Sequence, residues 1–492
     1  MERKYAHALS ALMVCASASL ACASVTEYTE LLRLEDSGGG APNEVYGNSV
    51  AFDGTTAVVG QYGDNLNSGA VHVYTWTGST MVEREIIVHD DVLEADYFGY
   101  AVAVRGDMLL IGAPGDDDKG GEAGAVYLYD LSTDPATFTT RFYSWDESPA
   151  EYFGWSIDLD DDYFIVGSPY DSINANFEGS ATLYKDNGFF WGAHQKLMPK
   201  LGGANAYFGT DVDLDGDRLI VGAPGSSDTS GANRGVAYLY AVDGFSGNYE
   251  VSLLLESSSS QDGAEFGFAV DVSGDLIAIG APSQDFGLGL LDVYYDVTGG
   301  GAWTYYNSLL PSGASTFDYY GIDVDIAGDT IFVGSLFGEG LGPNTGCVHG
   351  IQFVPGVGNF QEVERYYDSN LAGTDEGALG SSVAAHETYL LAGAPWRDSY
   401  QGSALFFGPA RIWNNPGGGQ WANAANWFGG SVPEASNSVF FPLPGVYTVA
   451  FPVGTAPEIM SLSQTDGFVT FDLLNGGLSI NNDNAEGLQI GS

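Results

Sequence analysis

Cysteine is scarce in this sequence, and its absence limits how the fold can be stabilised. The chain has three cysteines; Cys15 and Cys22 lie in an apolar N-terminal segment, which leaves Cys347 alone in the rest of the protein. A lone cysteine excludes an intrachain disulfide framework, so we expect stability to come from a hydrophobic core. The sequence also lacks any Asn-x-Ser/Thr acceptor site, which removes N-glycosylation.

Positive charge is equally scarce. The chain has 15 Lys and Arg against 64 Asp and Glu, giving a formal net charge of −49. The negative electrostatic field of such a chain repels nucleic acid and anionic membrane surfaces, so we expect no nucleic-acid partner. Cations and basic surfaces suit it better. An alternative interpretation is that most of these carboxylates only keep an exported protein soluble.

Long hydrophobic runs are confined to the N-terminus. An apolar stretch from Ala8 to Ala23 follows Glu2, Arg3 and Lys4 and ends in a small-x-small pattern at Ala21-Cys22-Ala23. This pattern predicts a signal peptide over residues 1–23 and a secreted, extracellular or cell-surface protein. Lipidation at Cys22 is the alternative. No later run approaches the length of a membrane span, so we expect no transmembrane segment after the signal peptide.

Seven copies of one phrase recur at a spacing of roughly 52 to 59 residues, which is the signature of a repeat architecture. An aromatic or leucine residue followed by glycine opens each copy, and a hydrophobic strand running into glycine follows. The openings are Tyr46-Gly47, Phe98-Gly99, Phe153-Gly154, Phe208-Gly209, Phe266-Gly267, Tyr320-Gly321 and Leu379-Gly380. The closing glycines are Gly60, Gly112, Gly167, Gly222, Gly280, Gly334 and Gly393, mostly followed by Ala-Pro or Ser-Pro.

Each copy contains four short strands. Two strands joined by a Gly/Asp turn form a hairpin, and a third strand such as Gly124–Tyr129 and a more variable fourth strand follow. Four antiparallel strands per repeat form one blade of a β-propeller. The seventh copy ends at Gly408 without a fourth strand, whereas residues 27–33 form an unpaired strand before the first copy. We therefore predict an all-β, seven-bladed propeller over residues 24–410, in which the N-terminal strand completes the last blade.

The repeated Phe-Gly and Gly-Ala-Pro phrases resemble the FG-GAP repeats of integrin α-subunit heads, in a compact bacterial form. The resemblance implies a seven-bladed propeller, extracellular placement and a role in adhesion or ligand recognition. In the integrin repeats, calcium binds a hairpin loop of Asp residues, but the nearest match here, Asp211 to Asp217, is shortened and has Leu219 where a late acid is expected. We expect Asp211 and Asp213 to line an exposed or channel-facing strand instead.

Acidic residues cluster in two sets of loops that a propeller places on one face. We expect divalent cations, with calcium as the one cofactor that the sequence indicates, in the loops that follow the Gly-Ala-Pro phrases. These residues are Asp64, Asp116, Asp117, Asp118, Asp171, Asp228, Asp285, Glu339 and Asp398. The loops entering each Phe-Gly corner add Asp96, Glu151, Asp262, Asp318, Asp375 and Glu376. The alternative is that each Asp caps its own loop through backbone N–H groups.

Pro395-Trp396-Arg397-Asp398 places an indole and a guanidinium on the same face, so Trp396 and Arg397 are candidate ligand-binding residues. Enzyme signatures are scarce: the five histidines after the signal peptide lie in different repeats at no metal-ligand spacing, and Cys347 starts a third strand. We expect a non-enzymatic binding or adhesion module for an extracellular protein or glycan. The alternatives are a propeller enzyme acting on extracellular polysaccharide and a purely structural surface protein.

The composition changes after residue 410. Gly417-Gly418-Gly419 and three tryptophans, Trp413, Trp421 and Trp427, precede short alternating segments such as Val446–Phe451. Residues 411–492 are predicted to be β-rich and resemble the start of a β-solenoid, with Leu473–Ile480 as one rung. Because no anchor or cap is evident before Ser492, we expect that an anchor lies downstream of a truncated product.

Overall fold

The computed structural model describes residues 28–37, 43–77, 80–146, 148–243, 247–259, 261–296, 298, 301–311, 313–338, 344–354, 358–368 and 377–412, with short segments from 419 to 490. The expected signal peptide lies outside these residues, as do Glu339, Asp375 and Glu376. Within the described part, no helix is long and apolar enough to cross a membrane.

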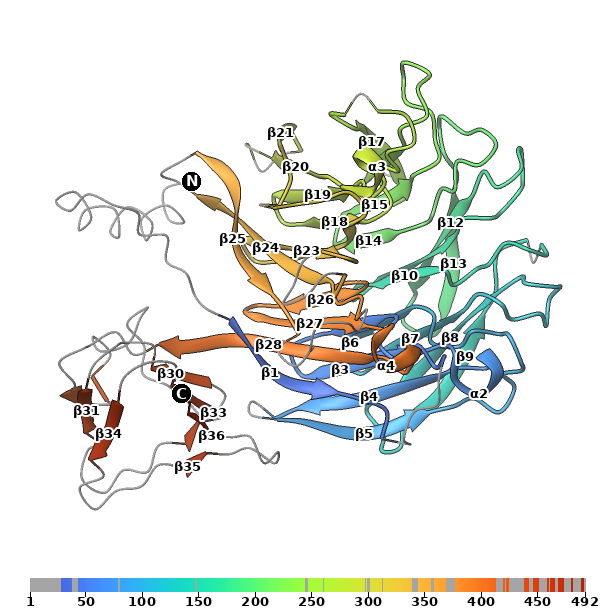
Figure 1. Cartoon of the computed structure of the whole chain (residues 1–492). Helices are drawn as coiled ribbons and strands as arrows, with labels where there is room; N and C mark the ends of the chain where they lie inside the picture. The colour runs from blue at the N-terminus through green and yellow to red at the C-terminus, as the bar shows by residue number, and fades with distance from the viewer. Residues whose placement is uncertain are drawn as a thin grey trace.

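The chain forms seven blades arranged in a ring, each an antiparallel sheet of four strands (Figure 1). Blades 1 to 3 comprise β2 Val50–Phe52, β3 Thr56–Gln61, β4 Ala70–Trp76 and β5 Met81–Ile87; β6 Val102–Arg105, β7 Met108–Ala113, β8 Ala125–Asp130 and β9 Thr137–Phe142; and β10 Ser156–Leu159, β11 Tyr163–Ser168, β12 Ser180–Asp186 and β13 Trp191–Leu197. Blades 4 and 5 comprise β14 Val212–Asp215, β15 Arg218–Ala223, β16 Val236–Val242 and β17 Tyr249–Glu256; and β18 Val270–Ser273, β19 Leu276–Gly280, β20 Leu291–Asp296 and β21 Trp303–Leu309.

Blades 6 and 7 complete the ring. Blade 6 comprises β22 Tyr320–Ala327, β23 Thr330–Ser335, β24 Cys347–Val354 and β25 Asn359–Tyr366, and blade 7 comprises β26 Val383–His386, β27 Tyr389–Ala394, β28 Ser403–Ile412 and the N-terminal strand β1 Tyr28–Leu34. Three one-turn elements lie in loops after second strands: α2 Asp64–Asn67, α3 Gln284–Gly287 and α4 Arg397–Tyr400. The loops after second strands and the loops that enter the next blade lie on one face of the ring. We call this the upper face.

The core lies between neighbouring blades. The second strand of a blade is apolar along almost its whole length, and in β7 every residue after Met108 is buried. A strand covered on both sides has this composition, since each of its faces packs on another layer. One core cluster joins Val58 of blade 1 to Phe98 and Leu109 of blade 2, so the same apolar strands hold the blades to one another.

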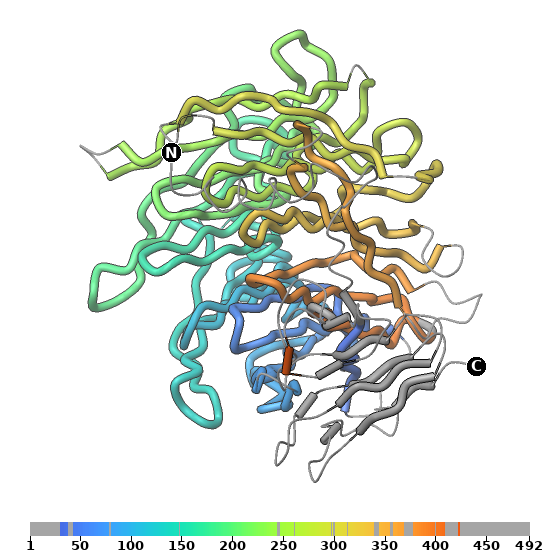
Figure 2. Tube along the Cα trace, turned by 90° about the vertical axis from the view of Figure 1, so that its left-hand side faces the viewer, coloured from blue at the N-terminus to red at the C-terminus, as the bar shows by residue number. Residues whose placement is uncertain are grey.

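The N-terminal strand closes the ring, as the sequence predicted. β1 pairs antiparallel with β28, with Leu34 opposite Ala404, and so supplies the fourth strand of blade 7. Figure 2 shows the blue N-terminal part of the chain beside the orange last blade. Pairing the two ends of the array removes an exposed sheet edge.

The repeated glycines mark the closest contacts between blades. A Cβ atom added to Gly112 of blade 2 would lie 2.2 Å from the carbonyl oxygen of Gly154 in blade 3. Only glycine permits an approach this close. The same contact recurs around the whole ring, in the pairs Gly60–Gly99, Gly112–Gly154, Gly167–Gly209, Gly222–Gly267, Gly280–Gly321, Gly334–Gly380 and Gly393–Gly47. The second glycine of each repeat and the first glycine of the next therefore form one structural unit.

The C-terminal region pairs its strands in parallel, unlike the blades. β28 continues to Ile412 and pairs with β30 Ser438–Phe441, which pairs with β33 Ser461–Gln464 and then β36 Leu488–Ile490. Parallel pairs also join β29 Gly419–Gln420, β31 Val446–Ala450 and β34 Phe468–Asp472, and join β32 Glu458–Ile459 to β35 Ser479–Ile480. Successive parallel strands stacked in several sheets are the arrangement of a β-solenoid, as expected from the sequence. Most of the rung proposed at Leu473–Ile480 lies outside the described residues.

Candidate functional site

An aromatic pocket of about 580 Å³ opens on the upper face across blades 1 to 3. Its rings form a continuous series: the centroids of Tyr62 and Tyr100 lie 5.4 Å apart, those of Tyr100 and Trp155 4.7 Å, and those of Trp155 and Tyr170 5.4 Å. Tyr97, Pro114, Glu122, Ala150, Tyr152 and Phe177 complete the lining. Aromatic lining with a few polar groups is the usual character of a ligand site. We call this the aromatic pocket.

The Phe-Gly corners place these rings. Tyr97 and Tyr100 flank Phe98-Gly99, and Tyr152 and Trp155 flank Phe153-Gly154. The residue before each corner has a left-handed backbone in all seven repeats, with φ of 58° at Tyr97 and 55° at Tyr152. Because the conformation recurs at every corner, it belongs to the repeat itself; what distinguishes blades 2 and 3 is that aromatic residues flank the corner on both sides. Burial, together with the Glu122 carboxylate, raises the pKa of Tyr152, so its phenol remains a hydrogen-bond donor.

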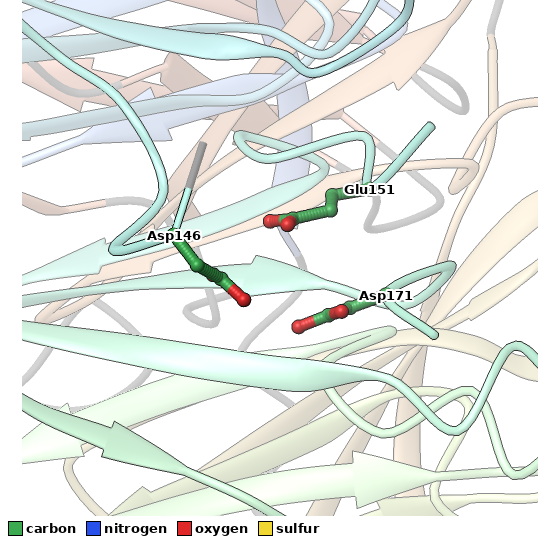
Figure 3. Close-up of side chains that lie close together, drawn as sticks. All are labelled: Asp146, Glu151 and Asp171. Atoms are coloured by element: carbon green, nitrogen blue, oxygen red, sulfur yellow. The ribbon is translucent and has the colours of Figure 1, made fainter. Parts of the chain in front are cut away.

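Three carboxylates gather beneath the same loops of blade 3. One ligand oxygen from each of Asp146, Glu151 and Asp171 lies within 4.8 Å of the other two (Figure 3). Asp146 and Glu151 come from the loop entering blade 3, and Asp171 comes from the loop after β11. Within the described part of the chain this is the one group of three or more His, Cys, Asp or Glu side chains with such spacing. We call it the blade 3 acidic cluster.

The ammonium of Lys196 lies inside this cluster, 2.5 Å from Asp146 Oδ1 and 2.8 Å from Asp171 Oδ2. Burial opposes the charged form of this lysine, but the two carboxylates outweigh burial and raise its pKa. Glu151 is fully buried; its Oε1 accepts the backbone N–H of Ser148 at 3.0 Å, whereas Oε2 has no hydrogen-bond partner. Burial is the main reason why the pKa of Glu151 is raised. The cluster thus holds three acids and one base.

A second set of carboxylates lines the central channel, a cavity of about 720 Å³ enclosed by the first strands. The first strands of neighbouring blades belong to separate sheets, and aspartate side chains bridge them. Asp211 accepts the backbone N–H of Val270 at 2.7 Å, and Asp323 accepts that of Val383 at 2.7 Å. Burial raises the pKa of Asp211 to about 7 and also raises that of Asp323. These carboxyls act as structural links between blades.

Comparison with known proteins agrees with this architecture. Five segments match the FG-GAP repeat family: residues 30–74, 81–129, 137–184, 191–240 and 303–350. The chain is a seven-bladed FG-GAP repeat propeller. It is 28% identical to human integrin alpha-E over 203 residues, which are 37% of this chain and 16% of integrin alpha-E. Sqt1 from Saccharomyces cerevisiae aligns with 77% of this chain and 98% of its own, with a TM-score of 0.43 and 11% identity. The repeat family and the integrin similarity are those of a binding or adhesion type of propeller.

The FG-GAP propeller does not gather most of the acids that the sequence singled out into one site. Asp116 is buried, where its Oδ2 accepts the Tyr127 hydroxyl at 2.8 Å and lies 3.4 Å from Arg141, and Asp118 pairs with the same arginine at 2.6 Å. Asp117 is exposed. The alternative interpretation, in which an aspartate caps its own loop, describes Asp228. Its Oδ1 accepts the N–H groups of Ser230 and Ala232 and also the Ser230 hydroxyl at 2.6 Å, and this hydroxyl hydrogen bond is the main cause of its lowered pKa.

The remaining candidates lie apart from one another. Asp64 and Asp285 belong to α2 and α3 of blades 1 and 5, and Asp398 belongs to α4 of blade 7. Among the described residues, Asp171 and Glu151, one from each of the two sets of loops, join a group of three acids. Calcium binding therefore stays a prediction. The acids of blade 3 have a spacing that fits a metal ion better than that of the acids around Asp116.

Trp396 and Arg397 contact loops that follow strands of the neighbouring blade 6. The Trp396 ring packs 5.2 Å from that of Phe337, and Arg397 donates to the buried carboxylate of Asp368 at 2.8 Å. The aromatic pocket lies instead in blades 1 to 3. A sequence pattern could have predicted the aromatic pocket: in blades 2 and 3 the phrase Tyr-Phe-Gly is followed by a further aromatic residue, Tyr100 or Trp155.

Proposed function

We propose that this FG-GAP propeller is an extracellular binding module whose aromatic pocket holds a neutral sugar ring of a glycan. The observation that carries the proposal is the series of half-buried rings from Tyr62 through Tyr100 and Trp155 to Tyr170, which line a pocket on one face of the ring of blades. A rigid surface of aromatic faces buries a large contact area at little cost in conformational entropy.

The polar groups of the pocket fit the same ligand class. Sugar rings present C–H faces that stack on aromatic rings and hydroxyls that need hydrogen-bond partners at the edge. Tyrosine phenols around the pocket donate and accept, and the exposed Glu122 carboxylate accepts. The strong negative charge of the chain would repel an anionic glycan, whereas a neutral glycan meets no such barrier.

Two further findings support an extracellular binding role. The matched repeats and the similarity to human integrin alpha-E belong to adhesion-type propellers. The N-terminal pattern that ends at Ala23 predicts a secretory signal peptide.

A neutral-glycan array followed by isothermal titration calorimetry tests the proposal. We expect binding that falls by at least about tenfold in Trp155→Ala, as for a central aromatic contact. Phe189→Ala is the matched control, because Phe189 is 96% exposed in the turn between β12 and β13 on the opposite face. Equal glycan binding by wild type and Trp155→Ala, or binding to basic peptides alone, would contradict the proposal. Turnover of a polysaccharide would identify an enzyme instead.

A further inference from the structure

We propose that Asp146, Glu151 and Asp171 form a Ca²⁺ site in which the ion competes with the ammonium of Lys196. The three carboxylates point toward one another from two loops, with ligand oxygens within 4.8 Å of each other (Figure 3). Glu151 supplies the second observation, because its Oε2 is buried and has no hydrogen-bond partner. A buried carboxylate oxygen without a donor is costly unless a water or an ion satisfies it.

The sheet beneath the cluster carries three hydroxyls, two of which lack hydrogen-bond partners. Ser168 and Ser180 are directly opposite each other on β11 and β12, and Thr182 is two residues beyond Ser180, so the three side chains share one face. Ser180 donates to Asp171 Oδ2 at 2.6 Å, which places that face against the cluster. The hydroxyls of Ser168 and Thr182 are buried on it without a hydrogen bond. The site therefore offers neutral oxygens in addition to its three carboxylates.

Blade 2 shows how the same position is filled when no ion site is built. Asp96, Asp116 and Arg141 are the counterparts of Glu151, Asp171 and Lys196 in the repeat. There, the residue equivalent to Thr182 is Tyr127, whose phenol donates to Asp116 and accepts from Arg141 at 2.9 Å. The large ring satisfies the buried groups directly. In blade 3 the Thr182 hydroxyl makes no hydrogen bond, Oε2 of Glu151 has no partner, and Asp146 joins the group.

The donor set selects the ion. All the available ligand atoms are oxygens, which suits a hard cation and disfavours zinc or copper. Calcium accepts six to eight oxygens at about 2.3–2.6 Å in flexible geometry, so ligand oxygens up to about 5 Å apart can share one ion. Magnesium demands a near-ideal octahedron with shorter bonds and retains its waters. The cluster therefore favours Ca²⁺ over Mg²⁺.

Occupation of the site bears on the aromatic pocket because the same loops build both. Glu151 lies between Ala150 and Tyr152, and Asp171 follows Tyr170, all three of which line the pocket. A cation that joins Glu151 to Asp171 would fix the loop entering blade 3 against the loop after β11. This second step rests on the proposed glycan-binding function, whereas the ion site itself does not.

Calcium titration of the full chain without any glycan tests the ion site. By calorimetry after chelator treatment, we expect one Ca²⁺ site that Mg²⁺ fills more weakly. Glu151→Gln removes one ligand charge and should weaken Ca²⁺ by at least about tenfold, whereas Lys196→Met removes the competing ammonium and should strengthen it by a similar factor. Asp96→Asn is the matched control in blade 2 and should leave the Ca²⁺ affinity unchanged.

The melting temperature gives a second readout if Glu151→Gln folds poorly. Calcium should raise the melting temperature of Lys196→Met by more than that of wild type, because this variant holds three acids without their ammonium. The proposal is overturned if wild type and Lys196→Met bind no Ca²⁺, or if Asp96→Asn loses binding as Glu151→Gln does. Glycan affinity measured with and without Ca²⁺ then tests the coupling: Ca²⁺ binding without any glycan binding would overturn the proposed function and keep the ion site.

Discussion

The carboxylate of Asp213 in blade 4 accepts the backbone N–H of Val272 in blade 5 at 2.9 Å. The two residues lie on first strands that belong to separate sheets. The Asp213 side chain therefore links two strands that have no backbone hydrogen bonds to each other. The ring of first strands is held together by such links around the central channel.

Stability should fall as the pH rises from 5 to 8. Burial raises the pKa of Asp211 and of Asp158 to about 7 from an ordinary value of 3.8, so the folded state holds these protons more tightly than the unfolded chain. The resulting stabilisation is complete below about pH 4 and is lost as the pH rises through about 7. Scanning calorimetry should show a drop in melting temperature of at least about 4 °C.

Repulsion among all the acids of the chain would also lower stability at high pH, so a variant must separate the two causes. Asp211→Asn keeps an acceptor for Val270 and cannot ionise, so its melting temperature should depend less steeply on pH. Asp217→Asn removes an equal charge from an exposed position in the same blade and should keep the slope of wild type. Equal slopes in all three proteins would show that the channel carboxyl does not titrate as inferred.

Gly222→Ala should be among the most destabilising substitutions in the propeller. A Cβ atom there would lie 1.9 Å from the carbonyl oxygen of Gly267, so blades 4 and 5 would have to separate. We expect a loss of more than about 4 kcal/mol or failure to fold, judged by chemical denaturation. Gly203→Ala meets nothing within 4 Å and should change stability by less than about 0.5 kcal/mol. Comparable losses in the two variants would refute the steric explanation.

Asp368→Ala should weaken the closure of the ring. The Asp368 side chain is fully buried and contacts Arg33 of β1 and Arg397 of α4, so its removal leaves two guanidinium groups without this partner. Breaking a buried pair of this kind costs about 3–5 kcal/mol, measurable by denaturant unfolding. Asp161→Ala is the control, since its pair with Arg105 is exposed and should contribute less than about 1 kcal/mol. A loss in Asp368→Ala no larger than the control would contradict a closing role.

Cys347 should be inert to thiol reagents in the folded protein. The residue is buried at the start of β24, and burial raises the pKa of its thiol to about 12. Because the thiolate is the reactive form, we expect no labelling at pH 8 until denaturant unfolds the chain. Labelling of the native protein at the rate of an exposed cysteine would disprove this burial.

The fold could be predicted because its determinants are local and repeated. The glycine corner after an aromatic residue or leucine and the apolar strand that runs into glycine recur seven times. An extra strand before the first copy and a missing fourth strand in the last copy imply closure, which the pairing of β1 with β28 confirms. The alternation of Asp211 and Asp213 likewise indicated an exposed or channel-facing strand, and the structure places both in the lining of the channel. Each inference needed only chain order and the two-residue period of a strand.

Tertiary structure alone decided which acids meet. Asp116, Asp117 and Asp118 look richest in sequence, yet Tyr127 and Arg141 satisfy Asp116, whereas Asp146 and Glu151 approach Asp171 from a different loop. One residue that differs is across the sheet, where Thr182 stands in place of Tyr127, and this equivalence appears only when neighbouring strands are paired. The aromatic pocket likewise requires rings from three blades. The sequence by itself determined the repeat, because each strand and turn depends on residues that are close together in the chain. Which side chains meet from distant loops was decided only by the packing of the folded chain.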